Sequence, residues 1–196
     1  MYENLTVGIL AIQGDFDRHR YQLDLVGAQP RPVRLPGDLS AIDALIIPGG
    51  ESTTMNIMID RFGLRAPLVE YTHARPVWGT CAGMIMLGMK IEDNQADVQT
   101  LGVLDIDVQR NGYGRQVFSF EDSLRADLGH HKKPLTATFI RAPRITRMGK
   151  NVICLAEYDS SPVLVREGSI LASSFHTELG NDTTLLRYFL QEMVTR

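Results

Sequence analysis

Cysteine and long apolar runs are scarce in this 196-residue chain, and each shortage excludes a class of protein. Two cysteines are too few for the disulfide framework of a small secreted domain. No apolar stretch approaches the roughly 20 residues that a membrane-spanning helix requires. The first residues enter an apolar segment at once, without the basic region or cleavage site of a signal peptide. We therefore expect a cytoplasmic protein, whose reducing surroundings keep its thiols free.

An excess of positive charge is also absent. The net charge is −3 and no long basic run occurs, so we expect no nucleic-acid partner. The sequence also lacks metal-ligand spacing, so neither a metal nor a cofactor is expected. Four histidines stand alone and are expected to be solvated: His19, His73, His130 and His131. The length and a hydrophobic fraction of 44% suit one domain over residues 1–196.

Apolar runs that alternate with helical patterns predict an α/β fold in the first half of the chain. Near-continuous apolar runs are typical of strands buried on both faces of a parallel sheet. The strands are predicted at 5–12, 32–35, 44–47 and 76–80, with helices starting near 15, 52 and 66. This order predicts a three-layer, flavodoxin-like architecture in which helices flank a mostly parallel sheet.

The second half of the chain predicts an antiparallel extension of that sheet. Apolar and polar residues alternate over 101–108, as in antiparallel strands with one solvated face. Further strands are predicted at 116–120, 135–140 and 151–157, a hairpin at 163–175, and an amphipathic helix after 182. The polar segments 88–100 and 121–133 are predicted to be loops, and Cys154 a small core residue.

Residues 76–87 (PVWGTCAGMIML) carry the strongest chemical signal in the sequence. An apolar strand ends in Gly-x-Cys-x-Gly and continues as a helix, which predicts a sharp turn with Cys81 at its apex. Glycines two residues to either side let the strand and helix approach closely. The helix N-terminus offers free N–H groups and partial positive charge, which favour the nucleophilic thiolate. The alternative is a buried structural cysteine.

Two other strands end in residues suited to ligand binding. Residues 48–54 (PGGESTT) follow the strand at 44–47, and the glycine pair lets the backbone approach a ligand. Ser52 or Thr53 is expected to cap the next helix. Arg141 directly ends the strand at 135–140 and is placed to clamp a carboxylate.

The strand that ends at Phe175 is followed by His176 and Glu178. Side chains two positions apart can point the same way at a strand end, so Glu178 can orient His176 as a base. Alone, this pair would be interpreted as a surface feature. With Cys81 earlier in the chain, it predicts a Cys-His-Glu triad.

Together these segments resemble the class I, triad-type glutamine amidotransferases, and within them the PdxT/SNO family of glutaminase subunits of pyridoxal 5′-phosphate synthase. The segments that carry the resemblance are 11–14 (AIQG), 48–54, 79–83 (GTCAG), 110–116, 139–143 (FIRAP) and 174–178 (SFHTE). The chain departs from the family pattern at Thr177, where proline is usual, and at 112–113, where Ser-Phe is more frequent.

The resemblance implies roles for individual residues. Cys81 would be the nucleophile, His176 the base and acid, and Glu178 the residue that orients the imidazole. The implied glutamine-binding residues are Gly50, Glu51, Ser52, Arg110, Ile140 and Arg141. The implied oxyanion hole consists of backbone N–H groups of Gly49, Gly50 and Ala82.

The resemblance also implies a reaction and a partner. The chain would hydrolyse L-glutamine and pass ammonia to a PdxS/SNZ-type synthase, a (β/α)8 barrel, within a hetero-oligomer that makes pyridoxal 5′-phosphate. Two alternatives remain at this point. One is a γ-glutamyl hydrolase or peptidase on the same fold, and the other is a non-catalytic regulatory subunit.

Overall fold

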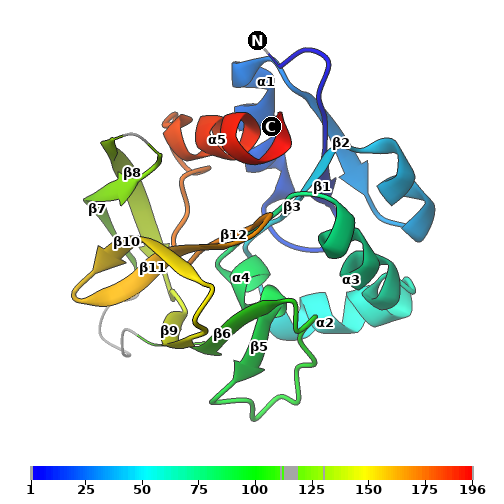
Figure 1. Ribbon diagram of the computed structural model, residues 1–196. Coiled ribbons are helices and arrows are strands. Elements are labelled where there is room, and N and C mark those ends of the chain that lie inside the picture. The colour runs from blue at the N-terminus through cyan, green and yellow to red at the C-terminus, as the bar shows by residue number, and fades with distance from the viewer. Residues whose placement is uncertain (1, 111, 113–118, 130, 196) are drawn as a thin grey trace.

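A seven-stranded sheet forms the centre of the computed structural model, which describes residues 2–110, 112, 119–129 and 131–195. Its strand order is β10-β11-β12-β4-β3-β1-β2 (Figure 1). The strands are β1 (Thr6–Leu10), β2 (Gln29–Val33), β3 (Ala44–Ile47), β4 (Val77–Thr80), β10 (Ile153–Tyr158), β11 (Ser161–Glu167) and β12 (Ile170–Ser173). The five strands from β12 to β2 are parallel, whereas β11 and β10 extend the sheet through antiparallel pairs. The predicted mostly parallel sheet is confirmed.

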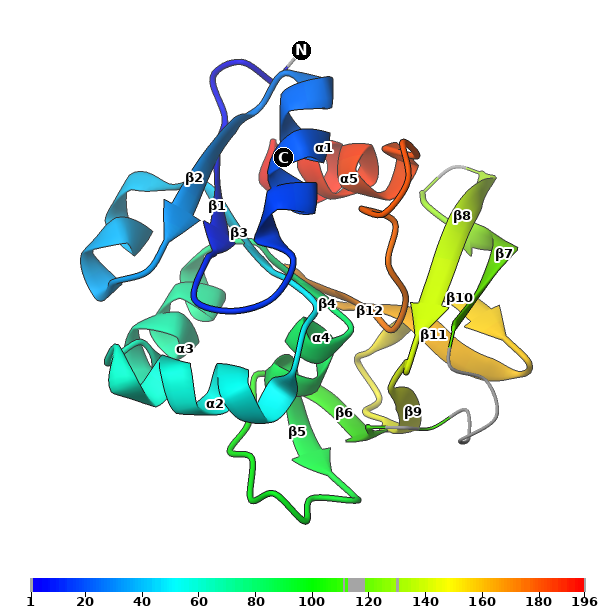
Figure 2. The same cartoon turned by 180° about the vertical axis from the view of Figure 1, so that it is seen from behind.

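Helices cover both faces of this sheet (Figures 1 and 2). One face carries α1 (Phe16–Val26) and α5 (Thr184–Phe189), which continues as a π-helical turn over Leu190–Val194. The other face carries α2 (Ser52–Arg61), α3 (Arg65–Ala74) and α4 (Ala82–Leu87). A 3-10 turn, η1 (Pro36–Ala41), connects β2 to β3. The predicted three-layer α/β architecture is therefore confirmed.

The apolar alternation of β3 shows why both faces need cover. Leu45 and Ile47 belong to one buried cluster, whereas Ala44 and Ile46 belong to a second cluster on the opposite face. All four residues are at most 1% exposed, because successive side chains of a strand point to opposite faces. Full burial of each large aliphatic side chain contributes about 1.5–3 kcal/mol. The sheet thus separates two hydrophobic cores and contributes side chains to both.

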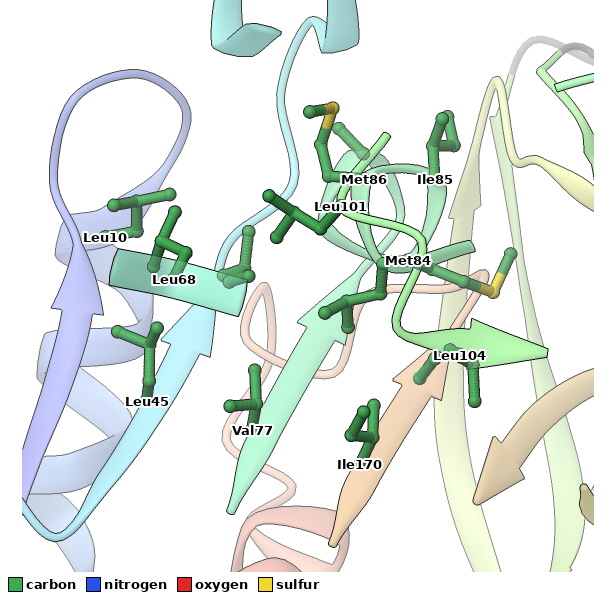
Figure 3. Packing of buried hydrophobic residues seen from close by; sticks show 14 of the residues in the cluster. Leu10, Leu45, Leu68, Val77, Met84, Ile85, Met86, Leu101, Leu104 and Ile170 are labelled. Atoms are coloured by element: carbon green, nitrogen blue, oxygen red, sulfur yellow. The ribbon is translucent and has the colours of Figure 1, made fainter. Parts of the chain in front are cut away.

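Helix α4 lies directly against the strands that lead to the predicted nucleophile. Figure 3 shows Met84 on the helix above Val77 of β4, with Ile170 of β12 beside them. Leu87 on the same helix is also fully buried. This packing fixes the turn between β4 and α4 relative to the sheet.

Two smaller sheets lie beside the main one. The first contains β5 (Gly88–Ile91), β6 (Leu104–Gln109) and β9 (Arg144–Met148). The second is a hairpin of β7 (Ser119–Asp127) and β8 (Lys132–Ile140). They correct two predictions, because β5 begins the segment 88–100 and the hairpin contains most of 121–133, both predicted to be loops.

The hairpin of β7 and β8 can be rich in charged residues because only one of its faces is buried. Leu124 and Ala126 point inward and are at most 4% exposed, while Arg125 and Asp127 between and after them face solvent. The alternation is that of a half-buried strand, hidden within a charged segment. In β5 the two central residues are exposed and the two end residues are buried, so the sequence lacks the apolar–polar alternation that would predict a strand.

Several other predictions have definite outcomes. Helix α1 ends at Gly27, whose left-handed backbone (φ 78°) favours glycine. Cys154 is only partly buried, so its assignment to the core was wrong. Most of the segment 110–116, the start of the predicted strand at 116–120, and His130 fall outside the described residues. Within the described part of the chain, no helix has the length and apolar character to cross a membrane.

Candidate active site

Cys81 occupies the apex of the turn between β4 and α4, as the sequence predicts. Its backbone has φ 50° and ψ −103°, a conformation that costs a non-glycine residue about 1–3 kcal/mol. Its N–H donates to the carbonyl of Ser173 on β12 at 2.7 Å, which anchors the turn to the neighbouring strand. A β-carbon on Gly83 would overlap the carbonyl oxygen of Ile47. The glycine is required because the helix lies against β3.

His176 and Glu178 form a buried pair in the segment that follows β12. The main chain of His176 is fixed by two hydrogen bonds with Thr138 on β8, at 2.8 and 2.9 Å. Its ring Nδ1 lies 2.5 Å from Oε1 of Glu178. The two residues are 8% and 1% exposed, so the interpretation as a surface pair is excluded.

The environment of this pair favours its charged form. Burial lowers the pKa of His176, but hydrogen bonding and negative charge from Cys81 and Glu178 outweigh burial and raise the pKa to about 10. Burial raises the pKa of Glu178, but the charges of His19 and His176 and the hydrogen bond to His176 lower it to about 2. The imidazolium–carboxylate form therefore dominates at neutral pH.

Cys81 and His176 meet at one cavity of about 400 Å³, although 95 positions separate them in sequence. The cavity lies at the carboxyl ends of the parallel strands, where open α/β sheets bind ligands. Its lining residues are Asp15, Gly49, Gly50, Glu51, Ser52, Cys81, Ile85, Arg110, Ile140, Arg141, His176 and Leu179. All six residues expected to bind glutamine are among them. Ala82, the third residue expected in the oxyanion hole, begins α4 directly after Cys81.

The glycine-rich loop is held by Glu51, which corrects the prediction that Ser52 or Thr53 caps α2. The Glu51 carboxylate accepts hydrogen bonds from the backbone N–H groups of Thr53 and Thr54, at 2.9 and 2.7 Å. These bonds satisfy free donors of the helix and lower the pKa of Glu51 despite its partial burial, which raises it. The acidic cap thus fixes the loop that lines the cavity.

Two arginines supply positive charge at the cavity. Arg110 donates from Nη2 to the carbonyl of Asp93 at 3.2 Å, and its buried Nε has no hydrogen-bond partner but lies 4.0 Å from Asp93 Oδ1. Arg141 is exposed and has φ 43°, so the end of β8 is strained where it reaches the cavity. The carbonyl of Ile140, just before it, lies 4.0 Å from Cys81 Sγ. These cations can bind the carboxylate of a small ligand.

His19 was wrongly expected to be solvated, because it is 1% exposed on α1. Its Nε2 lies 3.1 Å from Thr80 Oγ1 and 3.5 Å from Glu178 Oε1. The signal that identifies it is helical spacing, since His19, Gln22, Leu23 and Val26 form the buried face of α1. His73 and His131 are exposed as expected.

Gln22, one turn after His19, was not singled out from the sequence. Its Nε2 donates to the carbonyl of Thr177, between the two residues of the buried pair, at 2.9 Å. It also lies within 3.2 Å of the carbonyl oxygens of Gly180 and Asp182. Helix α1 therefore holds the segment that carries His176 and Glu178. Over the described residues, no group of three or more His, Cys, Asp or Glu side chains is arranged to hold a metal ion.

Comparison with known proteins gives consistent matches over nearly the whole chain. The model of the SNO glutamine amidotransferase family matches residues 9–195. A protein of Thermotoga sp. strain RQ2, described as pyridoxal 5′-phosphate synthase subunit PdxT, is 48% identical over 188 residues, which are 95% of this chain and 98% of that protein. The subunit of the same description from Thermotoga petrophila is 47% identical over the same shares. A crystal structure described as a glutamine amidotransferase superposes with a TM-score of 0.90 at 42% identity, covering 97% of this chain and 99% of that one.

Proposed function

Because the chain belongs to the SNO glutamine amidotransferase family, we propose that it hydrolyses L-glutamine to L-glutamate and ammonia with Cys81, His176 and Glu178 as a catalytic triad. The observation that carries this proposal is the buried His176–Glu178 pair at the same cavity as Cys81. A reactive cysteine needs a base within reach and a third group that fixes the base. Cys81 and His176 line this cavity, and Glu178 contacts His176 from its buried position.

The proposed reaction begins with attack of the Cys81 thiolate on the side-chain amide carbon of glutamine. The carbonyl oxygen becomes negative, and backbone N–H groups of Gly49, Gly50 and Ala82 are the proposed donors to it. Loss of one such donor costs about 3 kcal/mol in comparable enzymes. The support is that Gly49 and Gly50 line the same cavity as Cys81, and that Ala82 directly follows Cys81.

His176 handles the protons in both halves of the proposed reaction. Because its pKa is about 10, the imidazolium holds a proton at neutral pH and gives it to the departing ammonia. The neutral ring then accepts a proton from water, which cleaves the γ-glutamyl thioester and releases glutamate. Glu178 keeps the ring oriented and stabilises its charged form.

We propose that glutamine binds with its α-carboxylate at Arg110 and Arg141, alongside Gly50, Glu51, Ser52 and Ile140. Two guanidinium groups at a cavity of about 400 Å³ match the charge and size of one amino acid. A peptidase would require space for a longer chain beyond those cations. Release of ammonia from glutamine, compared with cleavage of γ-glutamyl peptides, separates the two activities.

The proposed partner is a PdxS/SNZ-type pyridoxal 5′-phosphate synthase subunit, in a cytoplasmic hetero-oligomer. The support is that the relatives from Thermotoga are described as subunits of pyridoxal 5′-phosphate synthase. Free ammonia is mostly protonated near neutral pH and is then a poor nucleophile. Direct delivery to an acceptor enzyme avoids this loss.

The decisive experiment measures ammonia release from glutamine with and without the synthase subunit. Cys81→Ser is expected to abolish the release while thermal unfolding stays cooperative. Cys154→Ser is the matched control, because Cys154 is the other free cysteine and does not line the cavity. Undiminished activity of Cys81→Ser would refute the proposal and favour a regulatory role.

A further inference from the structure

His19 lies on helix α1 beside the buried pair of His176 and Glu178. Its Nε2 lies 3.5 Å from Glu178 Oε1, the oxygen that also contacts His176 Nδ1 at 2.5 Å. Both His19 and Glu178 are 1% exposed, so water does not compete at this contact. The rings of His19 and Trp78 pack in a T-shaped arrangement, with centroids 5.7 Å apart and planes at 83°. The ring is therefore held in one orientation.

The surroundings of His19 determine which nitrogen carries its proton. Thr80 donates its hydroxyl hydrogen to the carbonyl of Ile47 at 3.4 Å, so its oxygen presents lone pairs to His19. Glu178 is ionised and can only accept, because its pKa is held at about 2. The Thr80 hydroxyl oxygen at 3.1 Å and the Glu178 carboxylate at 3.5 Å thus both face Nε2, and the tautomer with hydrogen on Nε2 suits both.

The charge state of His19 follows from the same setting. Burial lowers the pKa of His19, and the charge of His176 lowers it further, whereas Glu178 and Asp15 raise it less. The lowered pKa favours the neutral ring at pH 7, in which one nitrogen carries a hydrogen; the ring becomes charged only toward the acidic range in which Glu178 titrates. A neutral donor restrains a carboxylate without removing the negative charge that His176 needs.

We propose that His19 is a positioning residue of the catalytic centre, whose Nε2–H restrains the Glu178 carboxylate and through it the His176 ring. This inference rests on the proposed glutaminase function. One oxygen of Glu178, Oε2, is buried without a hydrogen-bond partner, so Oε1 carries the orienting contacts. Without His19, Oε1 would keep its contact with His176 and lose the second imidazole beside it.

The test compares His19→Gln with His19→Asn. The Gln amide nitrogen reaches the position of Nε2, whereas the shorter Asn amide stops near Nδ1. Kinetics are measured on the complete chain with the synthase subunit, and thermal unfolding and proton NMR of the His176 Nδ1–H on the complete chain alone. His73→Gln is the control, because His73 is exposed.

The Gln variant is expected to keep kcat and the far-downfield Nδ1–H resonance. The Asn variant is expected to lower kcat by about tenfold, with KM for glutamine nearly unchanged, and to shift or broaden that resonance. Equal kcat and equal resonances in both variants would overturn the proposal, as would equal losses in both with the resonance retained. If wild type released no ammonia, the proposed function would fail, but the resonance would still report whether His19 restrains the pair.

Discussion

A β-carbon on Gly49 would overlap Cε1 of His176 and lie 3.2 Å from its Nδ1, the atom that contacts Glu178. The glycine-rich loop and the proposed base therefore share one space. Any side chain at position 49 must move either the loop or the imidazole. The position of the base is thus linked to that of the loop proposed to stabilise the oxyanion.

Gly49→Ala is therefore expected to lower kcat for glutamine by about 10²-fold or more, because a displacement of about 1 Å at reacting groups has that effect. Gly37→Ala is the matched control, since no atom lies within 4 Å of the position where its β-carbon would stand. Steady-state ammonia release measures both. Equal activities of the two variants would contradict the close approach of the loop to His176.

Glu178→Gln is expected to lower kcat by about 10²–10⁴-fold with little change in KM. The amide cannot stabilise the imidazolium, and it can force the ring into the wrong tautomer. Glu70→Gln serves as the control, because Glu70 is exposed on α3. A kcat within twofold of wild type would remove Glu178 from the triad.

The stability of the buried pair is expected to depend on pH. The pKa of Glu178 is about 2 in the folded chain against 4.5 ordinarily, so its contribution is complete above pH 4.5 and is lost as pH falls toward 2. The pKa of His176 is raised to about 10 from 6.5, so its contribution is complete below pH 6.5 and is lost as pH rises toward 10. The difference in melting temperature between wild type and Glu178→Gln should therefore be largest between pH 4.5 and 6.5. A difference that stays constant from pH 3 to 10 would contradict this.

Gln22→Leu is expected to destabilise the chain by about 1–3 kcal/mol, because it removes the donor to the buried carbonyl of Thr177. It should also lower activity, since Thr177 separates His176 from Glu178. Denaturant unfolding measures the first effect and ammonia release the second. Thr177→Val is the contrasting variant: the Thr177 hydroxyl is buried without a partner, so its removal should leave stability equal or higher.

Arg141→Ala is expected to raise KM for glutamine by about tenfold or more while kcat changes little, because a carboxylate clamp acts on ground state and transition state alike. Arg166→Ala is a control of the same charge change, since Arg166 lies on β11 and does not line the cavity. A change confined to kcat would instead place Arg141 nearer the reacting atoms.

The local sequence pattern was sufficient to predict the structure of segments whose deciding residues are adjacent in sequence. The buried strand at 44–47 was predicted to the residue, because an unbroken apolar run fits only the centre of a parallel sheet. The turn at Cys81 was predictable for a similar reason, since its two glycines and apolar flanks are contiguous.

The local sequence pattern did not predict the environment of a residue whose contact partner lies far away in sequence. Nothing near His19 reveals that Glu178, 159 positions later, will lie beside it. The cap at Glu51 was missed because Ser52 and Thr53 have the stronger intrinsic preference, yet Glu51 reaches two backbone donors at once. The strand at 135–140 was predicted within β8, but the part of the β7–β8 hairpin in 121–133 was missed because its charged residues mask the short inward-facing pattern.

The backbone at Cys81 has one more consequence, for the history of the chain. Glycine adopts a φ of 50° with a ψ of −103° far more readily than cysteine, so selection for folding alone would favour replacing this residue. Under prolonged selection for thermal stability alone, without selection for ammonia production, Cys81 should therefore be among the first residues to be replaced. Its retention in a living lineage would be a record of continuous use.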